Sequence, residues 1–371
     1  MTRVVIAPDS FKGTATARDA AAAIARGWAS VRPADDVRLA PQADGGEGTL
    51  DAIAAADPGA ALQTATVTGP DGRPVVARWL LRGAGEAVLE LAESSGLPLM
   101  AALDPLGATT RGLGELLGAA LDAGATSITI GLGGSASTDG GAGALAALGM
   151  TLTDAAGRSL PDGGGALGRL ERLDRAALRL PPPGGVRLLT DVTAPLLGAA
   201  GAAAIFGPQK GAGPGEVATL DAGLERFARL LGGDPALAGS GAAGGAGYGF
   251  SAAWGGVLVA GAPAIAALSG LPALVAGSDV VISGEGRFDA TSSAGKVVGH
   301  VLSILPETAH AVIVAGTFAA DAVLPDGRRA DPVPLDSLAP SVDAACDDAL
   351  RWLEAAGALA AERYSRVSSR G

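Results

Sequence analysis

Short apolar runs rich in β-branched residues alternate with Ala-rich helical segments at both ends of this 371-residue chain, and this alternation constrains its fold most strongly. Near the start, residues 4–7 read as a strand and residues 14–28 as a helix. Near the other end, residues 279–283 and 310–315 are again short strands, separated by a helix that begins near Gly295. Strands that alternate with helices predict a parallel sheet with helices packed on it.

The middle of the chain has a different pattern of predicted strands and helices. Residues 64–81 predict two antiparallel strands joined by a turn at Pro70–Arg73, and short strands are also expected at 88–91, 127–130 and 186–189. We therefore expect an α/β fold with two α/β domains, in which both chain ends form one doubly wound, Rossmann-like parallel sheet. The middle would be inserted as a second α/β domain, with the active site in the interdomain cleft.

The predicted boundaries are residues 1–65 plus 277–371 for the Rossmann-like domain and residues 66–276 for the inserted domain. A continuous split near residue 180, at the proline run 181–183, is the alternative. The chain is too long for one ordinary hydrophobic core, which supports two domains in either case.

Composition excludes several classes of partner. The net charge of -11 argues against nucleic acid, which is bound through clustered Lys and Arg. The most apolar window, residues 252–268, is interrupted by glycine and proline and is too short to span a membrane, so we expect a buried helix and a loop there. The single cysteine, Cys346, cannot form an internal disulfide and the first residues lead directly into a strand, so we expect a cytoplasmic protein. A monomer and a homodimer both fit the sequence.

Lysine is rare in this chain. Of 27 basic residues only Lys12, Lys210 and Lys296 are lysines, and each has a glycine beside it. Because arginine supplies the other positive charges, a lysine next to glycine predicts a position that requires a compact ammonium. Three residual surface lysines are the alternative.

Two loops near the N-terminus, residues 7–13 and 43–49, combine glycine with charged side chains. Their polar residues are Asp9, Ser10 and Lys12 in the first loop, and Asp44 and Glu47 in the second. The first loop follows a predicted strand, and ligands bind at the carboxyl ends of strands in open parallel sheets. The carboxylates of the second loop suit Mg²⁺, which prefers oxygen ligands. A capped helix start and a tight turn with solvated acids are the respective alternatives.

The longest glycine-rich loop, residues 131–141, follows a predicted strand and precedes a predicted helix at 142–148. Amides at a helix start, together with hydroxyl groups, form a cradle for phosphate. The residues expected to line this cradle are Gly133, Gly134, Ser135, Ser137, Gly140 and Gly141. The loop also fits a dinucleotide fingerprint, with Asp154 near the distance of a ribose-binding acid, so a dinucleotide site is the alternative.

Two later segments also place charged residues at strand ends. Asp191 follows the predicted strand 186–189, where a carboxylate can accept a hydroxyl proton or hold a metal ion, unless it caps a helix at 195–204. The charged residues of the last segment are Glu285, Arg287, Asp289 and Lys296. Arg287 can clamp a carboxylate through two parallel hydrogen bonds, unless it pairs with one of the neighbouring acids.

Together these segments resemble the class I bacterial glycerate kinases. The matching stretches, in chain order, are APDSFKG at 7–13, ADGGEGT at 43–49, GLGGSASTDGGAG at 131–143, the segment 191–212 that ends in FGPQKGA, GAAGG at 241–245, and the segment 284–296 that begins GEGRFD and ends in GK. They occur in order over most of the chain. The resemblance implies ATP- and Mg²⁺-dependent phosphorylation of D-glycerate, with 2-phosphoglycerate as the product.

For such a kinase, the chemistry of the individual residues predicts their roles. The predicted groups are Asp191, Lys12, Lys296 and Asp289 for catalysis; Asp9, Ser10, Arg287 and Glu285 for glycerate; Gly133, Gly134, Ser135, Ser137, Gly140, Gly141 and Lys210 for the nucleotide; and Asp44, Glu47 and Asp139 for Mg²⁺. Asp191 is the first candidate for the base that accepts the hydroxyl proton, and Asp289 is the second.

The chain departs from the family at a few positions. Thr138, Ala194 and Thr291 stand where amide side chains are expected, and Val297 stands in place of part of a Pro-containing pair. The lost amides could have oriented the substrate, so we expect a changed affinity or a changed preference among hydroxy acids. Two alternatives to a kinase are an NAD-dependent dehydrogenase that uses the loop at Gly131, and an inactive module that binds a nucleotide or a hydroxy acid.

Overall fold

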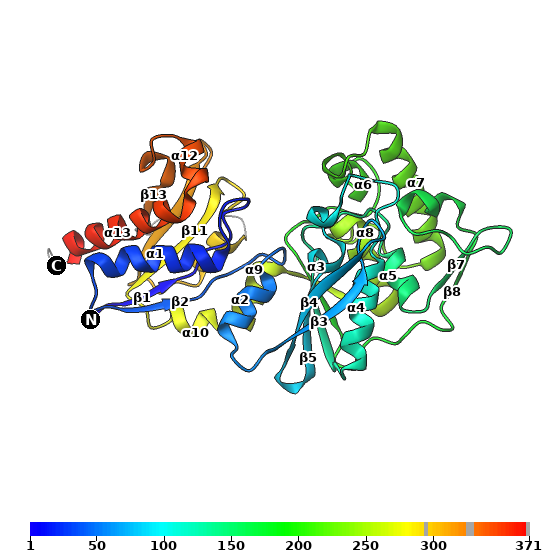
Figure 1. Cartoon of the computed structure of the whole chain (residues 1–371), viewed down its shortest axis with the longest axis horizontal. Coiled ribbons are helices and arrows are strands. Elements are labelled where there is room, and N and C mark those ends of the chain that lie inside the picture. Colours follow the sequence, from blue (N-terminus) through cyan, green and yellow to red (C-terminus); the bar gives the residue numbers. More distant parts are fainter. Residues whose placement is uncertain (293–295, 324–329, 369–371) are drawn as a thin grey trace. The chain divides into compact units, whose positions relative to one another are not determined.

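The computed structural model describes residues 1–292, 296–323 and 330–368. The chain folds into two compact units (Figure 1). The first unit comprises Met1–Asp44, Asp51–Pro58 and Ala260–Gly371, and the second comprises Gly45–Leu50 and Gly59–Val259. These compact units are not the same thing as domains that fold independently. The domain boundaries predicted at 65/66 and 276/277 therefore stay a prediction.

The first unit is built on a five-stranded parallel sheet in the order β13-β12-β11-β1-β2. Its strands are β1 (Arg3–Ile6), β2 (Asp36–Leu39), β11 (Val280–Phe288), β12 (His310–Phe318) and β13 (Ala330–Pro334). One face packs against α1 (Ala17–Val31), α12 (Val342–Asp347) and α13 (Ala349–Ser368), and the other against α9 (Gly261–Leu268), α10 (Leu271–Val275) and α11 (Val297–Ser303). Helices on both faces of a parallel sheet confirm the predicted doubly wound α/β class.

Helices α1 and α13 lie side by side in the first unit and approach each other closely (Figure 1). A Cβ atom at Gly27 would lie 1.8 Å from the carbonyl oxygen of Glu354, and one at Gly357 would lie 2.1 Å from that of Ile24. Because these distances are far below van der Waals contact, neither position has room for any side chain.

We therefore expect Gly27→Ala to lower the free energy of unfolding by about 1–3 kcal/mol, since the two helix backbones must separate to admit a methyl group. Gly215→Ala is the control, because a Cβ there has no neighbouring atom within 4 Å, and it is expected to be neutral or slightly stabilising. Urea unfolding measures both variants. Equal effects of the two substitutions would contradict the close packing of α1 and α13.

The second unit is built on a mixed six-stranded sheet in the order β10-β9-β6-β5-β4-β3. Its strands are β3 (Ala61–Thr68), β4 (Pro74–Arg82), β5 (Glu86–Glu90), β6 (Ser127–Gly131), β9 (Val186–Thr190) and β10 (Val257–Ala260), and β7 (Thr151–Thr153) pairs with β8 (Arg172–Asp174) apart from this sheet. Its main helices are α3 (Leu91–Ser95), α4 (Arg111–Asp122), α5 (Ala142–Ala147), α6 (Ala202–Phe206), α7 (Pro214–Leu231) and α8 (Ala242–Trp254). Helix α2 (Thr49–Ala56) also begins in this unit. The predicted antiparallel pair within 64–81 is confirmed as β3 and β4.

The structure differs from the predicted elements in three places. The helix expected at 195–204 begins only at Ala202, because the chain turns at Gly198, whose φ of +85° does not fit a helix. The window 252–268, expected as helix and loop, contains strand β10. Residues after Ser283, expected as a loop, continue β11 as far as Phe288 because they pair with β12. None of the helices in the described ranges is long and apolar enough to cross a membrane.

Candidate active site

The carboxyl ends of β1, β2 and β11 meet at one edge of the five-stranded sheet in the first unit. Beyond the strands, Asp9 N donates to Gly284 O (2.8 Å) and Gln42 N donates to Pro8 O (2.9 Å). At Gly286 the loop after β1 also passes closely, because a Cβ there would lie 3.5 Å from Lys12 N. These backbone contacts hold the loops after β1 and β2 next to β11.

An acidic cluster results at this edge, formed by Asp9, Asp44 and Glu285. Asp9 is only 9% exposed. Burial, followed by the charge of Asp44, raises its pKa to about 7; Glu285 adds to this rise, whereas the Ser10 amide and Lys12 oppose it. Ser10 N donates to Asp9 Oδ1 at 2.6 Å. The structure thus brings together residues that the sequence placed in separate loops.

Glu285 extends this cluster along β11. Burial raises the pKa of its carboxyl, Asp289 and Asp44 raise it further, and a hydrogen bond from Ser292 and the charge of Lys296 lower it. Its Oε1 atom is buried and has no hydrogen-bond partner within the described residues. Lys296, which directly precedes α11, therefore lies within electrostatic reach of the cluster.

Arg287 and Asp289, also predicted for this site, have different surroundings. Arg287 is exposed, and in the ranges that the structure describes it forms no ion pair with either neighbouring acid. Asp289 accepts hydrogen bonds from Thr291 N (2.9 Å) and Thr291 Oγ1 (2.6 Å). The hydrogen bond from the Thr291 side chain is the main cause that lowers the pKa of Asp289, and a lowered pKa is unfavourable for a general base.

The glycine-rich loop after β6 is half accessible and half buried. Gly133 and Ser135 are half-buried and Gly134 is exposed, whereas Ser137, Gly140 and Gly141 are buried. The buried amides already have acceptors: Gly140 N donates to Gly244 O (3.0 Å) and Gly141 N donates to Asp139 Oδ1 (3.0 Å). The accessible part of the loop is its tip, residues 133–135, in which Gly133 N donates to Gly45 O (3.2 Å).

Asp139 lies wholly inside the second unit, 1% exposed. Its carboxylate accepts hydrogen bonds from Thr110 N (2.9 Å), Thr110 Oγ1 (2.8 Å), Gly141 N (3.0 Å) and Gly143 N (3.2 Å). Burial raises its pKa and these hydrogen bonds lower it. Four donors occupy its oxygens, so the carboxylate joins the glycine-rich loop to α4 and is poorly suited to hold Mg²⁺.

Lys210 is also inside the second unit, at the end of the short 3-10 helix Pro208–Lys210, and is 2% exposed. Its ammonium donates to Ser135 Oγ (2.8 Å) and to Ser137 O (2.5 Å). Burial lowers its pKa to about 7, and the charge of Asp139 acts in the opposite direction. The lysine therefore contacts the glycine-rich loop from its buried side.

Two further predicted residues, Asp191 and Glu47, lie at the surface of the second unit. Asp191 is exposed just after β9, and Glu47 is exposed in the turn before α2. Among the residues that the structure describes, no three His, Cys, Asp or Glu side chains are grouped closely enough to hold a metal ion. Asp154, the candidate ribose ligand of a dinucleotide site, accepts from Ala156 N (2.9 Å) and Arg158 N (3.0 Å) and pairs with Arg158, so it stabilises a local turn.

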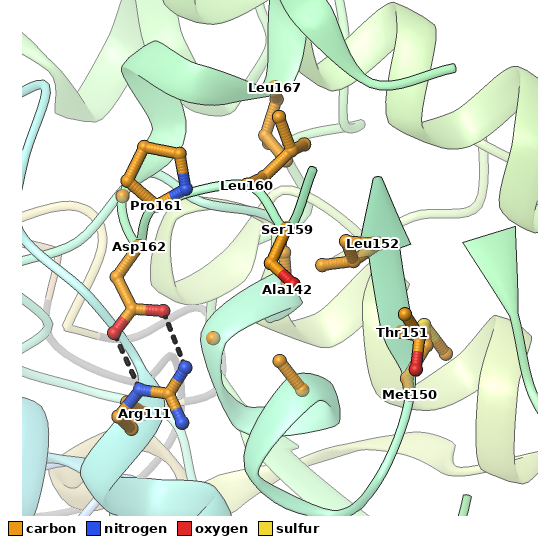
Figure 2. A pocket seen from close by; sticks show the side chains of 13 residues that line it. Arg111, Ala142, Met150, Thr151, Leu152, Ser159, Leu160, Pro161, Asp162 and Leu167 are labelled. Carbon is orange, nitrogen blue, oxygen red and sulfur yellow. Dashed lines mark hydrogen bonds and ion pairs between the residues drawn. The ribbon is translucent and has the colours of Figure 1, made fainter. Parts of the chain in front are cut away.

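A cavity of about 200 Å³ lies in the second unit between α5, β7 and the loop 159–163, as Figure 2 shows. At its edge Arg111 and Asp162 face each other, with Nε to Oδ2 at 2.5 Å and Nη2 to Oδ1 at 2.8 Å. None of the predicted site residues lines this cavity. One of its lining residues, Gly143, donates to Asp139, so the cavity adjoins the buried side of the glycine-rich loop.

The chain is similar to known proteins over most of its length. The model of the glycerate kinase family matches residues 4–365. The chain is 42% identical over 332 residues to glycerate 2-kinase of Escherichia coli (strain K12), covering 86% of each chain. It is 43% identical over 306 residues to glycerate kinase of Bacillus subtilis (strain 168), covering 79% of each chain.

The fold leads to the same relatives. A crystal structure assigned as a glycerate kinase 2 from Salmonella typhimurium LT2 superposes with a TM-score of 0.83 at 38% sequence identity, and the match covers 99% of both chains. Sequence and fold agree over almost the whole length, and the chain belongs to the glycerate kinase family.

Proposed function

We propose that this chain transfers the γ-phosphoryl group of ATP to D-glycerate and forms 2-phosphoglycerate. The observation that carries the proposal is the cluster of Asp9, Asp44 and Glu285 at the carboxyl edge of a parallel sheet, with Lys12 and Lys296 acting on it electrostatically. Phosphoryl transfer requires positioned charges of both signs and little covalent chemistry from the protein. The relatives named above support the choice of glycerate.

The exposed guanidinium of Arg287, with Ser10, would bind the glycerate carboxylate, and Lys12 and Lys296 would balance charge on the transferred group. Asp9 joins Asp191 and Asp289 as a candidate for the base that accepts the hydroxyl proton. Asp289 ranks last, because its carboxylate already accepts two hydrogen bonds from Thr291.

In the second unit the tip of the glycine-rich loop, Gly133 to Ser135, would contact the nucleotide phosphates, since it is the accessible part of that loop. Ser137, Gly140, Gly141 and Lys210 would support this tip from inside. Mg²⁺ is commonly held by one or two carboxylates together with substrate phosphates, and Asp44 and Glu47 are each a candidate for one such carboxylate. When bound, the ion would neutralise charge on the phosphates; Asp139 is left out because donors occupy its oxygens.

A coupled assay tests the proposal. Purified protein with ATP, Mg²⁺ and D-glycerate is expected to release ADP, and phosphorus NMR is expected to show the phosphate on the 2-hydroxyl. Omission of glycerate is the control and should abolish most of the release. ADP release that does not depend on glycerate, or binding of a nicotinamide cofactor instead of ATP, would contradict the kinase assignment.

We also propose that the protein acts in the cytoplasm, as a monomer or a homodimer.

A further inference from the structure

Lys210 is buried at a position where an ammonium has few partners. Only 2% of the residue is exposed, and a charged group is costly to remove from water unless hydrogen bonds compensate it. The two acceptors that the structure gives it are Ser135 Oγ at 2.8 Å and Ser137 O at 2.5 Å. Both belong to the glycine-rich loop, so Lys210 holds that loop.

The buried half of the loop is held separately, by backbone contacts with α8. Residues 243–245 of α8 have positive φ, and this includes Ala243 at +53°, a strained value for a residue with a side chain. A Cβ at Gly244 would lie 2.0 Å from Ser137 O, and Gly140 N donates to Gly244 O at 3.0 Å. Lys210 therefore ties the accessible tip, through Ser135, to a part of the loop that is already rigid.

The chemistry of this contact sets the direction of the Ser135 hydroxyl. In its charged form the Lys210 side chain has donors and no acceptor, so Ser135 Oγ then accepts from Lys210. The proton of the hydroxyl is then left to donate to another oxygen, and Ser135 is only half-buried. An oxygen of an anionic ligand at the loop tip is the acceptor that this arrangement suits.

We propose that Lys210 is a positioning residue that does not touch the nucleotide, but holds the Ser135 hydroxyl and the loop tip in the orientation that binds a nucleotide phosphate oxygen. This inference rests on the proposed function and gives Lys210 an indirect role within it.

Steady-state kinetics of Lys210→Met, Ser135→Ala and the double variant test the proposal. Each single variant is expected to raise the KM for ATP by roughly 10- to 100-fold, with the KM for glycerate nearly unchanged. Because the two residues act through one contact, the double variant should be no worse than the worse single variant. Effects that multiply in the double variant would show that Lys210 acts on the nucleotide independently of Ser135, and would overturn the proposal.

Lys210→Gln covers the case in which the methionine variant does not fold. Its amide can still donate to Ser135 Oγ or Ser137 O, so partial recovery of the KM for ATP relative to Lys210→Met is expected. Arg158→Ala, which removes an exposed ion pair in the same unit, is the matched control and should behave like the unmodified protein.

Hydrogen exchange in the protein without ligand tests the inference even if the proposed function fails. The amides of Gly133 and Ala136 donate to Gly45 O (3.2 Å) and Ser95 O (2.9 Å), so they report the order of the loop tip. Lys210→Met is expected to accelerate their exchange, and Arg158→Ala is not. Unchanged exchange in Lys210→Met would overturn the positioning role, whereas absent glycerate-dependent ADP release in the unmodified protein would overturn only the kinase assignment.

Discussion

Replacement of Asp9 by asparagine is expected to lower kcat for glycerate phosphorylation by about 10²- to 10⁴-fold. Asp9 is the most buried of the three acids in the cluster, and it lies at the end of β1 within the fields of Lys12 and Asp44. An amide of the same shape can neither accept a proton nor balance the positive charge of Lys12. The fold is expected to tolerate the change, because a neutral side chain costs less to bury than a carboxylate.

The controls for Asp9→Asn separate its role from a general loss of negative charge. Asp36, at the start of β2, pairs with Arg38, so Asp36→Asn should keep kcat unchanged. Asp191→Asn and Asp289→Asn are expected to reduce kcat less than Asp9→Asn. A variant Asp9→Asn that is folded by circular dichroism and retains kcat would contradict the role of this cluster, and a larger loss in Asp191→Asn would identify Asp191 as the base.

The sequence could predict those site residues whose place depends only on the direction of the strands before them. Asp9 and Glu285 lie 276 positions apart in the chain, yet each lies beyond or near the carboxyl end of a β-branched strand. Because the carboxyl ends of parallel strands share one edge of a sheet, assigning β1 and β11 to one sheet was enough to expect both acids there. The structure confirms the predicted α/β class and parallel pairing.

The parts that the sequence could not predict depend on partners distant in the chain. In the sequence, Asp139 resembles a metal ligand in a glycine-rich loop. Only the fold reveals that its carboxylate accepts two hydrogen bonds from Thr110, 29 positions earlier. Ser292 was given no role, although it acts on both Glu285 and Asp289. The spacing of Asp289 and Ser292 is typical of a local turn and was the available signal.

Likewise, nothing in the sequence indicated that the Lys210 side chain is buried. A lysine next to glycine in a loop predicts an accessible cation, and Lys210 was grouped from the sequence with the residues that bind the nucleotide. Its acceptors belong to a loop 73 and 75 positions earlier, and side-chain burial at that distance depends on tertiary packing. The same holds for Gly27, whose close contact with α13 involves residues more than 300 positions away.

The buried ammonium of Lys210 also predicts a pH dependence of stability. Burial lowers its pKa from 10.5 to about 7 in the folded protein. Between these two pKa values the unfolded chain binds a proton that the folded protein does not bind, so the free energy of unfolding rises as pH increases through this window. Below pH 7 the folded protein retains a charged Lys210 and the full cost of burying it.

Lys210→Met removes this titration, and the difference in unfolding free energy between the variant and the unmodified protein is therefore expected to change with pH. From about pH 7 towards pH 10 the unmodified protein should gain about 1.4 kcal/mol per pH unit relative to the variant. The stability of the variant relative to the unmodified protein should thus be greatest at and below about pH 7, although Ser137 O loses a donor. Urea unfolding at several pH values measures the difference, with Arg158→Ala as a control that should run parallel to the unmodified protein. Parallel curves for Lys210→Met would mean that the folded protein in solution does not bury this ammonium, and the positioning role would lose its structural basis.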